Sequence, residues 1–541
     1  DYQKAINVIE SIESHSPSIK QAYQKVCFLR ATELLKDNDI TGCISFLKKS
    51  IKNPIDKNLN ASSYFWLGEA CFLNNDIKNS QTYLNKYLEL YNLSDGLNSN
   101  ESPPFAYYTL AYTYYKLGKY KNALTYFEKA LSGLKAFNKE NKLSKVYLRT
   151  YPDVLMRAAD CNFLIRNYAR SMNYYSEVIT QKYPGIDYAL FQKSILYGLG
   201  TTPRADKKIE TLKYLLSNYS WSLYADDASY ELGDTYFNSG DYDNAVSTFN
   251  KTIENYKGSQ YNRKALLKLA LILFNKNKLT EAENHCTDLL DNFPNSEETK
   301  EVVHILKDIY IEKGDPEGYL ALNNKYKDIN LSLEEQDSIM YFAAENQYIK
   351  EACPRAVELF TKYLDHYPKG YFALNAHYYK SQCLINEKKF FNAKEDLIYV
   401  IEQGKTKFYE KVLSQLCDIY HYEEQDWNNA FSSYQKLYHI AEYKSNKTKA
   451  IRGLSISSYN LKKYMTCVKY GNLVLDSINF NSNDDNHLVE FYMAKSYYDM
   501  NKLDSAYQYF DSLSINQDNS FSVESFYWKT MIHFKNAEYD T

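Results

Sequence analysis

The chain has 541 residues, of which 45% are hydrophobic and 24% charged, a balance typical of a folded globular protein and not of a disordered one. Its formal charge of −3 offers no basic surface for nucleic acid, and no apolar run approaches the roughly 18 residues of a membrane span. Aromatic residues are unusually frequent at 16%, and 56 of them are tyrosines. One conventional core would not extend over this length, whereas a repeat protein can, because each unit buries its apolar face on its neighbours.

A recurring pair of residues marks the start of a predicted helix along the whole chain. A bulky residue follows a short polar turn, and a small residue stands three positions later. In chain order the pairs are Tyr2/Ala5, Ile40/Cys43, Ile77/Ser80, Tyr120/Ala123, Tyr168/Ser171, Tyr242/Ala245, Leu279/Ala282, Cys353/Ala356, Phe390/Ala393, Trp427/Ala430, Tyr464/Cys467 and Leu503/Ala506. From position 171 to position 467 the small residues fall on a 37-residue grid. The grid also predicts divergent repeats at Lys208 and Tyr319, where the small residue is missing.

Close contact between two helices explains the pattern. A small residue at the start of the second helix of a pair lets its backbone approach the first helix, and a bulky residue four positions later, such as Phe249, fills the same face. The first helix carries the complement, as in Leu232-Gly233-x-x-Tyr236. Steps such as Phe293-Pro294 end second helices, because the residue before proline disfavours the helical conformation.

Two segments show the full motif: Leu110-Ala111-x-x-Tyr114-x-x-x-Gly118-x-Tyr120-x-x-Ala123-x-x-x-Phe127-x-x-Ala130 and Leu232-Gly233-x-x-Tyr236-x-x-x-Gly240-x-Tyr242-x-x-Ala245-x-x-x-Phe249. They resemble the tetratricopeptide repeat. The resemblance covers essentially the whole chain and implies an all-α, right-handed α-α superhelix of about 13 complete helix pairs plus a half repeat at each end. The family period is about 34 residues, so the 37-residue unit is a departure. Its longer links, such as Tyr224-Ala225-Asp226-Asp227-Ala228, resemble those of bacterial envelope members of the Tol-Pal coordinator and outer-membrane assembly lipoprotein type.

We expect one continuous array over residues 1–541, cut from a longer protein, because it opens and ends within a repeat. It comprises N-terminal repeats at 1–94, a repeat flanked by long polar loops at 95–147, regular 37-residue repeats at 148–478 and truncated C-terminal repeats at 479–541. The two insertions, Asn92 to Pro104 and Ser132 to Lys145, are expected to be loops. They are either hinges or binding loops, or simply tolerated surface insertions.

No pattern for catalysis, cofactor binding or metal binding is found. There is no phosphate-binding glycine loop, nucleophile elbow or dinucleotide fingerprint. Cys417 and His421 could face one metal ion, but no second pair of ligands has usable spacing. The nine cysteines form an odd set without close pairing and are predicted to be buried thiols. We therefore expect neither an enzyme nor a cofactor or metal.

Aromatic residues recur on the first helices at two positions seven residues apart, which is close to two helical turns and so places them on one face. Five repeats carry them at both positions: Phe65/Phe72, Tyr108/Tyr115, Tyr230/Phe237, Tyr341/Tyr348 and Phe491/Tyr498. In the family this face lines the inner groove, so we predict that these rings contact a peptide or a helix of a partner. The alternative is that they pack neighbouring first helices together.

The resemblance implies a non-catalytic scaffold or adaptor for other proteins or peptides, with no nucleic acid, working in assembly or transport at a bacterial cell envelope. We expect a periplasmic or outer-membrane-associated location. Four triplets, Asp337-Ser338-Ile339, Asp476-Ser477-Ile478, Asp504-Ser505-Ala506 and Asp511-Ser512-Leu513, resemble the O-glycosylation signal of Bacteroidetes envelope proteins. Two alternatives stay open. One is a cytosolic chaperone-type adaptor that captures acidic C-terminal tails with lysine and asparagine, although no adjacent repeats show a convincing set. The other is the recruiting arm of an enzyme whose catalytic domain lies outside the chain.

Overall fold

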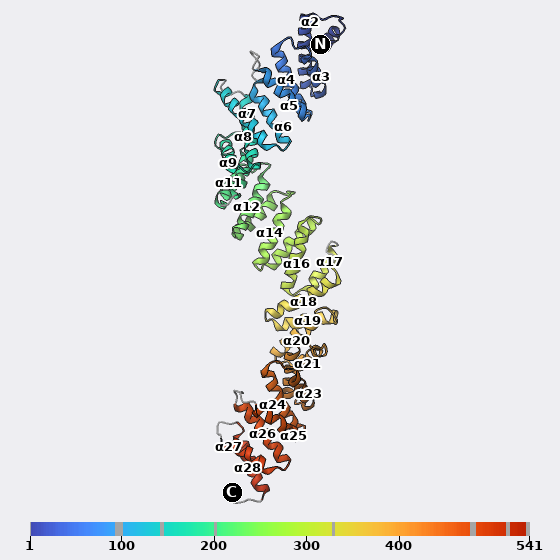
Figure 1. The fold of residues 1–541 in the computed structure, drawn as a ribbon, viewed down its shortest axis with the longest axis vertical. Helices are drawn as coiled ribbons and strands as arrows, with labels where there is room; N and C mark the ends of the chain where they lie inside the picture. The colour runs from blue at the N-terminus through green and yellow to red at the C-terminus, as the bar shows by residue number, and fades with distance from the viewer. Residues whose placement is uncertain are drawn as a thin grey trace. The chain divides into compact units, whose positions relative to one another are not determined.

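The computed structural model describes residues 2–91, 101–140, 145–199, 203–326, 331–476, 483–515 and 520–536. Within these residues the regular secondary structure is helical throughout, which confirms the expected all-α class. The chain divides into two compact units, residues 1–272 and 273–541. Within each unit, helices that follow one another in the sequence lie side by side (Figure 1), as in an α-α superhelix.

The helices alternate between two roles, as the sequence predicts. The first helices of the pairs are α2 (Pro17–Lys36), α4 (Lys57–Leu73), α6 (Pro103–Lys116), α8 (Lys145–Leu164), α10 (Ile186–Gly198), α12 (Ala225–Asn238), α14 (Asn262–Asn275), α16 (Glu298–Lys313), α18 (Leu333–Ile349), α20 (Ala373–Asn386), α22 (Tyr409–Asp418), α24 (Lys444–Asn460), α26 (Asn483–Asp499) and α28 (Ser522–Lys535). The second helices are α1 (Tyr2–Glu10), α3 (Ile40–Ile51), α5 (Ile77–Tyr91), α7 (Tyr120–Glu140), α9 (Tyr168–Thr180), α11 (Ala205–Asn218), α13 (Tyr242–Asn255), α15 (Leu279–Asn292), α17 (Pro316–Lys325), α19 (Cys353–His366), α21 (Phe390–Glu402), α23 (Trp427–Ile440), α25 (Tyr464–Asp476) and α27 (Leu503–Ile515). The described residues thus form 13 complete pairs with a half repeat at each end, as predicted.

Each of the twelve bulky residues singled out in the sequence is the first residue of a second helix. The grid positions without a small residue are also repeats: α11 and α17 begin three residues before Lys208 and Tyr319. Small residues serve the predicted close contact. In α12, a Cβ added to Gly233 would lie 2.6 Å from the ring of Phe249 in α13, so only glycine lets the two helices approach this closely.

The turn inside twelve of the 13 pairs has a left-handed residue at one fixed position. In twelve turns the residue two positions ahead of the second helix is left-handed, and the twelve are Asn38, Asn75, Gly118, Arg166, Gly240, Asn277, Gly314, Glu351, Lys388, Gln425, Lys462 and Asn501. In eleven of them the next residue donates its backbone N–H to the carbonyl five residues back, for example from Lys389 to Leu384 at 2.8 Å. This bond closes the end of the first helix in the Schellman manner.

The predicted loop at Ser132 to Lys145 is wrong over most of its length. Helix α7 continues to Glu140 because Leu131 and Leu134 remain buried on its inner face. Gly133 of the same helix approaches Pro104 closely. Residues 141–144 and most of the other insertion, 92–100, lie outside the described residues, as do residues 537–541 at the end of the chain.

The expectation that no cysteines pair is also wrong. Cys353 and Cys383 form a disulfide with a Cα–Cα distance of 5.1 Å, across 30 residues of sequence. The helix-pair repeat brings the start of α19 beside α20, so two cysteines far apart in the chain meet there. The other seven, Cys27, Cys43, Cys71, Cys161, Cys286, Cys417 and Cys467, are free and buried, as predicted for thiols that pack as small hydrophobic side chains. Among the described helices, none is both long and apolar enough to cross a membrane.

Candidate partner-binding surface

The ten predicted rings lie on first helices, namely α4, α6, α12, α18 and α26. Three of them, Phe65, Tyr341 and Phe491, are buried, with exposed fractions of 3%, 1% and 3%. The others, Phe72, Tyr108, Tyr115, Tyr230, Phe237, Tyr348 and Tyr498, are half-buried. Each of the ten rings also contacts another side chain of this protein, so packing accounts for part of the predicted set.

In three of the five pairs, the earlier residue stacks on the next repeat. Tyr341 lies parallel to Phe372, with ring centroids 4.3 Å apart and an interplanar angle of 7°. Phe372 is the residue directly ahead of α20, so the stack joins α18 to the following first helix. We call the interface between two consecutive first helices a joint. Three more joints contain the same stack: Tyr230–Tyr261 at 5.0 Å, Tyr378–Phe408 at 3.9 Å and Phe491–Phe521 at 5.3 Å.

In several pairs the later residue also reaches the next first helix, with its ring tilted or edge-on and not parallel to its partner. Tyr348 lies 4.7 Å from Tyr379, and Tyr498 lies 5.0 Å from Trp528. Phe237 receives the ammonium group of Lys268 at 4.2 Å from its centroid. These half-buried rings keep part of their surface exposed, so contact with a partner stays a prediction for them.

A π-helix changes the register of one repeat. Residues Ile419–Glu423 form η2 at the end of α22, and the turn bond that elsewhere spans five residues here spans six, from Asp426 to Tyr420 at 2.9 Å. One residue is therefore inserted, and the part of α22 ahead of it shifts by one position against the other repeats. Such insertions are often found at functional sites.

This shift identifies which residues occupy the stacking positions between α22 and α24. Ser414 stands where Tyr230, Tyr341, Tyr378 and Phe491 stand in four other repeats. Asn446, like Phe372, lies 21 residues before the small residue of its own second helix. Both aromatic rings are thus replaced by small polar side chains. A cavity of about 750 Å³, here called the α22–α24 cavity, opens at this joint, and both residues line it.

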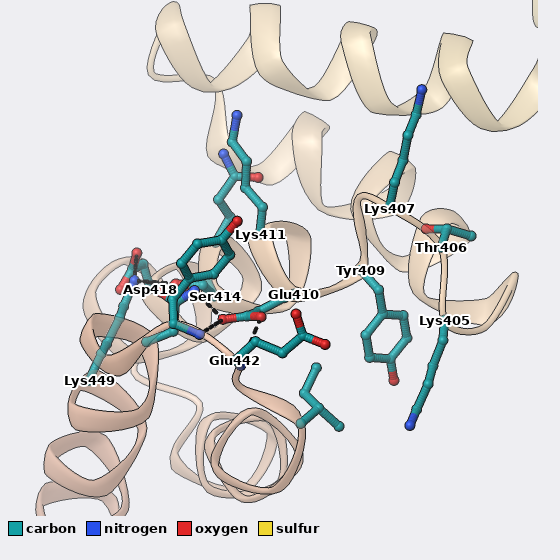
Figure 2. Close-up of a pocket in the computed structure, with 14 residues that line it drawn as sticks. Lys405, Thr406, Lys407, Tyr409, Glu410, Lys411, Ser414, Asp418, Glu442 and Lys449 are labelled. Carbon is teal, nitrogen blue, oxygen red and sulfur yellow. Dashed lines mark hydrogen bonds and ion pairs between the residues drawn. The ribbon is translucent and has the colours of Figure 1, made fainter.

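The acidic groups of the α22–α24 cavity are held by neighbouring donors (Figure 2). Glu410 accepts hydrogen bonds from the backbone N–H groups of Glu442 at 3.1 Å and Tyr443 at 3.2 Å, and from Asn446 Nδ2 at 2.8 Å. Burial opposes ionisation of this carboxyl group, but the hydrogen bonds lower its pKa. Its contacts fix the link between α23 and α24 against α22.

An ion pair also lines the cavity. Lys449 of α24 pairs with Asp418 of α22 and donates hydrogen bonds to the hydroxyl of Ser414 at 2.9 Å and to its carbonyl at 3.1 Å. Burial raises the pKa of Asp418, although the hydrogen bond from Lys449 opposes this. Lys449 thus occupies part of the space beside the small side chain of Ser414.

Three further lysines surround the cavity. In Figure 2 the ammonium groups of Lys407 and Lys411 extend to one side of Glu410, and that of Lys405 to the other. Lys411 Nζ donates to the hydroxyl of Tyr378 at 2.9 Å, and Lys407 lies over Phe408 at 4.8 Å. These contacts leave the cations near the surface, where they can meet a bound group.

A smaller cavity of about 450 Å³ lies against α19, α20 and α21. There His377 Nδ1 lies 2.6 Å from a carboxylate oxygen of buried Asp396, and Lys380 lies 3.2 Å from the other oxygen. The imidazole also stacks on Tyr399 at 3.8 Å. Among the described residues, no Ser, Thr or Cys hydroxyl or thiol is found hydrogen-bonded to this imidazole. Lys380 therefore offsets the buried charge of Asp396, and the described residues place no nucleophile beside the imidazole.

Cys417 and His421, which the sequence places on one helical face, are both buried. The hydroxyl of Tyr434 lies 3.3 Å from His421 Nδ1, and burial lowers the pKa of this imidazole to about 4. Within the described ranges, no group of three or more His, Cys, Asp and Glu side chains could hold a metal ion.

Comparison with known families supports what the fold indicates. Profiles of the tetratricopeptide repeat match residues 61–92 and 104–132. Residues 61–92 and 104–132 are therefore tetratricopeptide repeats. Such repeats bind other proteins, which indicates a protein–protein interaction scaffold. The profile of a family described as outer membrane lipoprotein matches residues 223–331. A search among curated proteins finds no significant match.

Several solved structures are similar to this tetratricopeptide-repeat chain at low identity. The structure of Naa15/Naa10 bound to HypK-THB shares 13% identity, with 94% of this chain and 80% of that chain covered and a TM-score of 0.36. The APC/C hetero-tetramer Cut9-Hcn1 shares 15%, with 95% and 90% covered and a TM-score of 0.27. BtubC from P. vanneervenii shares 15%, with 40% and 88% covered and a TM-score of 0.31. None of these similarities bears on function.

Proposed function

We propose that this protein is a non-catalytic scaffold of a bacterial cell envelope, located in the periplasm or at the outer membrane, where it holds partner proteins during assembly or transport. The observation that carries the proposal is the match of residues 223–331 to the outer membrane lipoprotein family. The repeats provide the means of holding partners, because a row of helix pairs presents a long surface formed by consecutive first helices.

The Cys353–Cys383 disulfide supports the envelope location. Disulfides persist in oxidising compartments such as the bacterial periplasm, and the cytosol keeps thiols reduced. The seven free cysteines are compatible with such a compartment because all of them are buried, which shields their thiols from oxidants. The Asp-Ser-apolar triplets give little further support. Ser512 is exposed, but Ser338 and Ser505 are half-buried, and Ser477 and Ile478 lie outside the described residues.

The alternative of a cytosolic adaptor for acidic C-terminal tails requires lysine and asparagine donors that are available to a ligand. Asn446 and Lys449, three positions apart on α24, both line the α22–α24 cavity. However, Asn446 donates to Glu410, and Lys449 pairs with Asp418, so both donors are engaged within the protein. This internal pairing favours the scaffold in the envelope over the tail-binding adaptor.

Fractionation of native cells tests the location. Thiols are blocked by an alkylating reagent before lysis, and the protein is followed through cytoplasmic, periplasmic and membrane fractions. We expect it in the periplasmic or outer-membrane fraction, with the Cys353 and Cys383 peptides joined in non-reducing mass spectrometry and unlabelled. Recovery in the cytoplasm with both residues alkylated would contradict the proposal.

A further inference from the structure

The α22–α24 joint lacks a contact that four other joints have. In those four, a ring of one first helix stacks on a ring just ahead of, or at the start of, the next first helix, with centroids 3.9 to 5.3 Å apart. At the corresponding positions the α22–α24 joint has Ser414 and Asn446, and the cavity opens there. These four joints show that a flat aromatic ring fits between two consecutive first helices of this protein.

The surfaces that remain in the cavity suit such a ring. Tyr409, Ile440 and Tyr443 line it together with the aliphatic stems of the lysines. Tyr443 precedes α24, and 68% of its surface is exposed. In the described part of the chain, no aromatic ring is found paired with that of Tyr443. Its face is therefore available to a ring from outside the protein.

The charges favour a carboxylate beside that ring. Glu410 and Asp418 already receive internal donors, whereas Lys405, Lys407 and Lys411 present their ammonium groups around the opening. Glu442 is the one further acidic residue of the lining, and it opposes them only in part. Glu410 keeps its negative charge because its donors are neutral, so the four lysines of the lining exceed its three carboxylates by one charge, and this excess attracts an acidic group.

We propose that the α22–α24 cavity binds an aromatic side chain of a partner protein, presented next to an acidic residue, so that the partner supplies the ring that this joint lacks. The inference rests on the proposed function, since it requires a partner protein. It adds the place of contact and the chemistry of the contacting segment.

Short peptides test the proposal on the full chain. Acetyl-Glu-Tyr-Glu-amide is compared with acetyl-Glu-Ala-Glu-amide and acetyl-Gln-Tyr-Gln-amide by calorimetric titration and saturation-transfer NMR. We expect the first peptide to bind at least about tenfold more tightly than either of the others, the scale of one stacked ring or one desolvated charge contact. Equal binding of the tyrosine and alanine peptides, or no binding of either, would overturn the ring site. Equal binding of the glutamate and glutamine peptides would overturn its acidic preference.

A variant whose cavity is filled by rings is compared with the wild-type chain in the same titration. Ser414→Tyr combined with Asn446→Phe introduces the ring pair found in four other joints, and we expect it to abolish binding of acetyl-Glu-Tyr-Glu-amide while Tm stays equal or rises. Asn446→Phe alone serves if the double variant folds poorly, because Ser414 then remains small beside Lys449. Ser432→Tyr adds a ring to an exposed position of α23 and should leave binding unchanged. Undiminished binding by a folded filled variant would refute the site.

The two proposals can fail separately. If cell fractionation places the protein in the envelope but the filled variant still binds the peptide, the scaffold stands and the cavity is not its contact. If the protein is cytoplasmic and the peptide binds only to the open cavity, the contact stands and the envelope role falls.

Discussion

The ring of Tyr378 lies parallel to the ring of Phe408, with centroids 3.9 Å apart and an angle of 11°, although 30 residues separate them in the chain. A contact of this kind lies on the border between two repeats, where each unit of a solenoid obtains the stability that it lacks alone. The ring therefore belongs to the interior of the array even where part of it is accessible. A substitution that removes such a ring should loosen the border between two repeats as well as one repeat.

We expect Tyr341→Ala to destabilise the C-terminal unit by about 3–5 kcal/mol, since it removes a buried ring that stacks on Phe372 and leaves a cavity. Urea unfolding measures the loss, and hydrogen exchange should locate it in α18 to α20. Tyr371, next to Phe372, is 89% exposed, so Tyr371→Ala should change stability by less than about 0.5 kcal/mol. Comparable losses in the two variants would show that the stack contributes nothing beyond surface packing.

The left-handed turn residues offer a stabilising substitution. Lys388 has φ 59°, a conformation that costs a side chain with a Cβ roughly 1–2 kcal/mol. Lys388→Gly removes this cost but gains freedom in the unfolded chain, so we expect a net increase in stability of about 0.5 kcal/mol. At Lys389, φ is −92°, and Lys389→Gly should instead lower stability by a similar amount. Both are measured by urea midpoint, and a gain in both or a loss in both would contradict the backbone argument.

Reduction should weaken the repeats around α19 and α20. The disulfide closes a segment with a sequence separation of 30 residues, for which the chain-entropy argument gives about 3–4 kcal/mol. We expect Cys353→Ser to lower Tm and to make Tm insensitive to a reductant, whereas the wild-type Tm falls when the reductant is added. Cys417→Ser, at a buried free thiol, keeps the bond and should retain the response to reductant. A wild-type Tm that ignores the reductant would speak against the bond.

The stability of the C-terminal unit should fall in mild acid because of His421. The folded pKa is about 4, below the ordinary value of 6.5, because burial disfavours the charged imidazole. Above pH 6.5 both states are neutral and the full stability is present; as pH falls towards 4, the unfolded state takes up a proton that the folded state rejects. Between pH 7.5 and pH 5 this difference in proton uptake lowers the free energy of unfolding by about 2 kcal/mol.

Urea unfolding at the two pH values, compared between wild type and His421→Phe, checks this expectation. The variant should lose about 2 kcal/mol less than wild type over the same interval. His439→Asn changes an exposed histidine at the end of α23 and should reproduce the wild-type loss. If wild type and His421→Phe decline in parallel, other groups account for the acid sensitivity.

The sequence predicts much of this fold, because helix spacing depends on a repeated steric requirement. The bulky residue that opens a helix and the small residue that lets it approach its partner recur with a fixed period, and even the turns ahead of α11 and α17, where the small residue is absent, keep that period. The boundary at Ser132 was missed since polar residues on the exposed face of α7 resemble a loop. The disulfide was missed because the chain offers no local pairing of Cys353 with Cys383.

The candidate site was harder to predict than the fold. The aromatic positions on the first helices were found, but Phe372 and Phe408, which complete the stacks, lie in link segments whose rings were not considered. Their separation of 30 or 31 residues from the partner ring was the available signal. Ser414 and Asn446 could not be recognised as cavity residues in the sequence. The cavity arises where the ring pair of four other joints is absent, and the absence of a ring leaves no motif. The single residue inserted in η2 also shifts Ser414 by one position. An alignment of the repeats on fixed spacing therefore does not place Ser414 at the position of the stacked rings.

The shared left-handed turn has a consequence for how this array diverges over evolution. Its geometry depends on backbone hydrogen bonds, and nine of the twelve left-handed positions hold residues other than glycine, each tolerated at a small energetic cost. Repeats can therefore exchange almost every side chain and still keep the same step from one helix to the next. Drift of this kind erodes recognisable motifs long before it erodes the architecture, which explains why repeat profiles recognise only short stretches of a chain whose helix pairs follow one plan throughout the described residues.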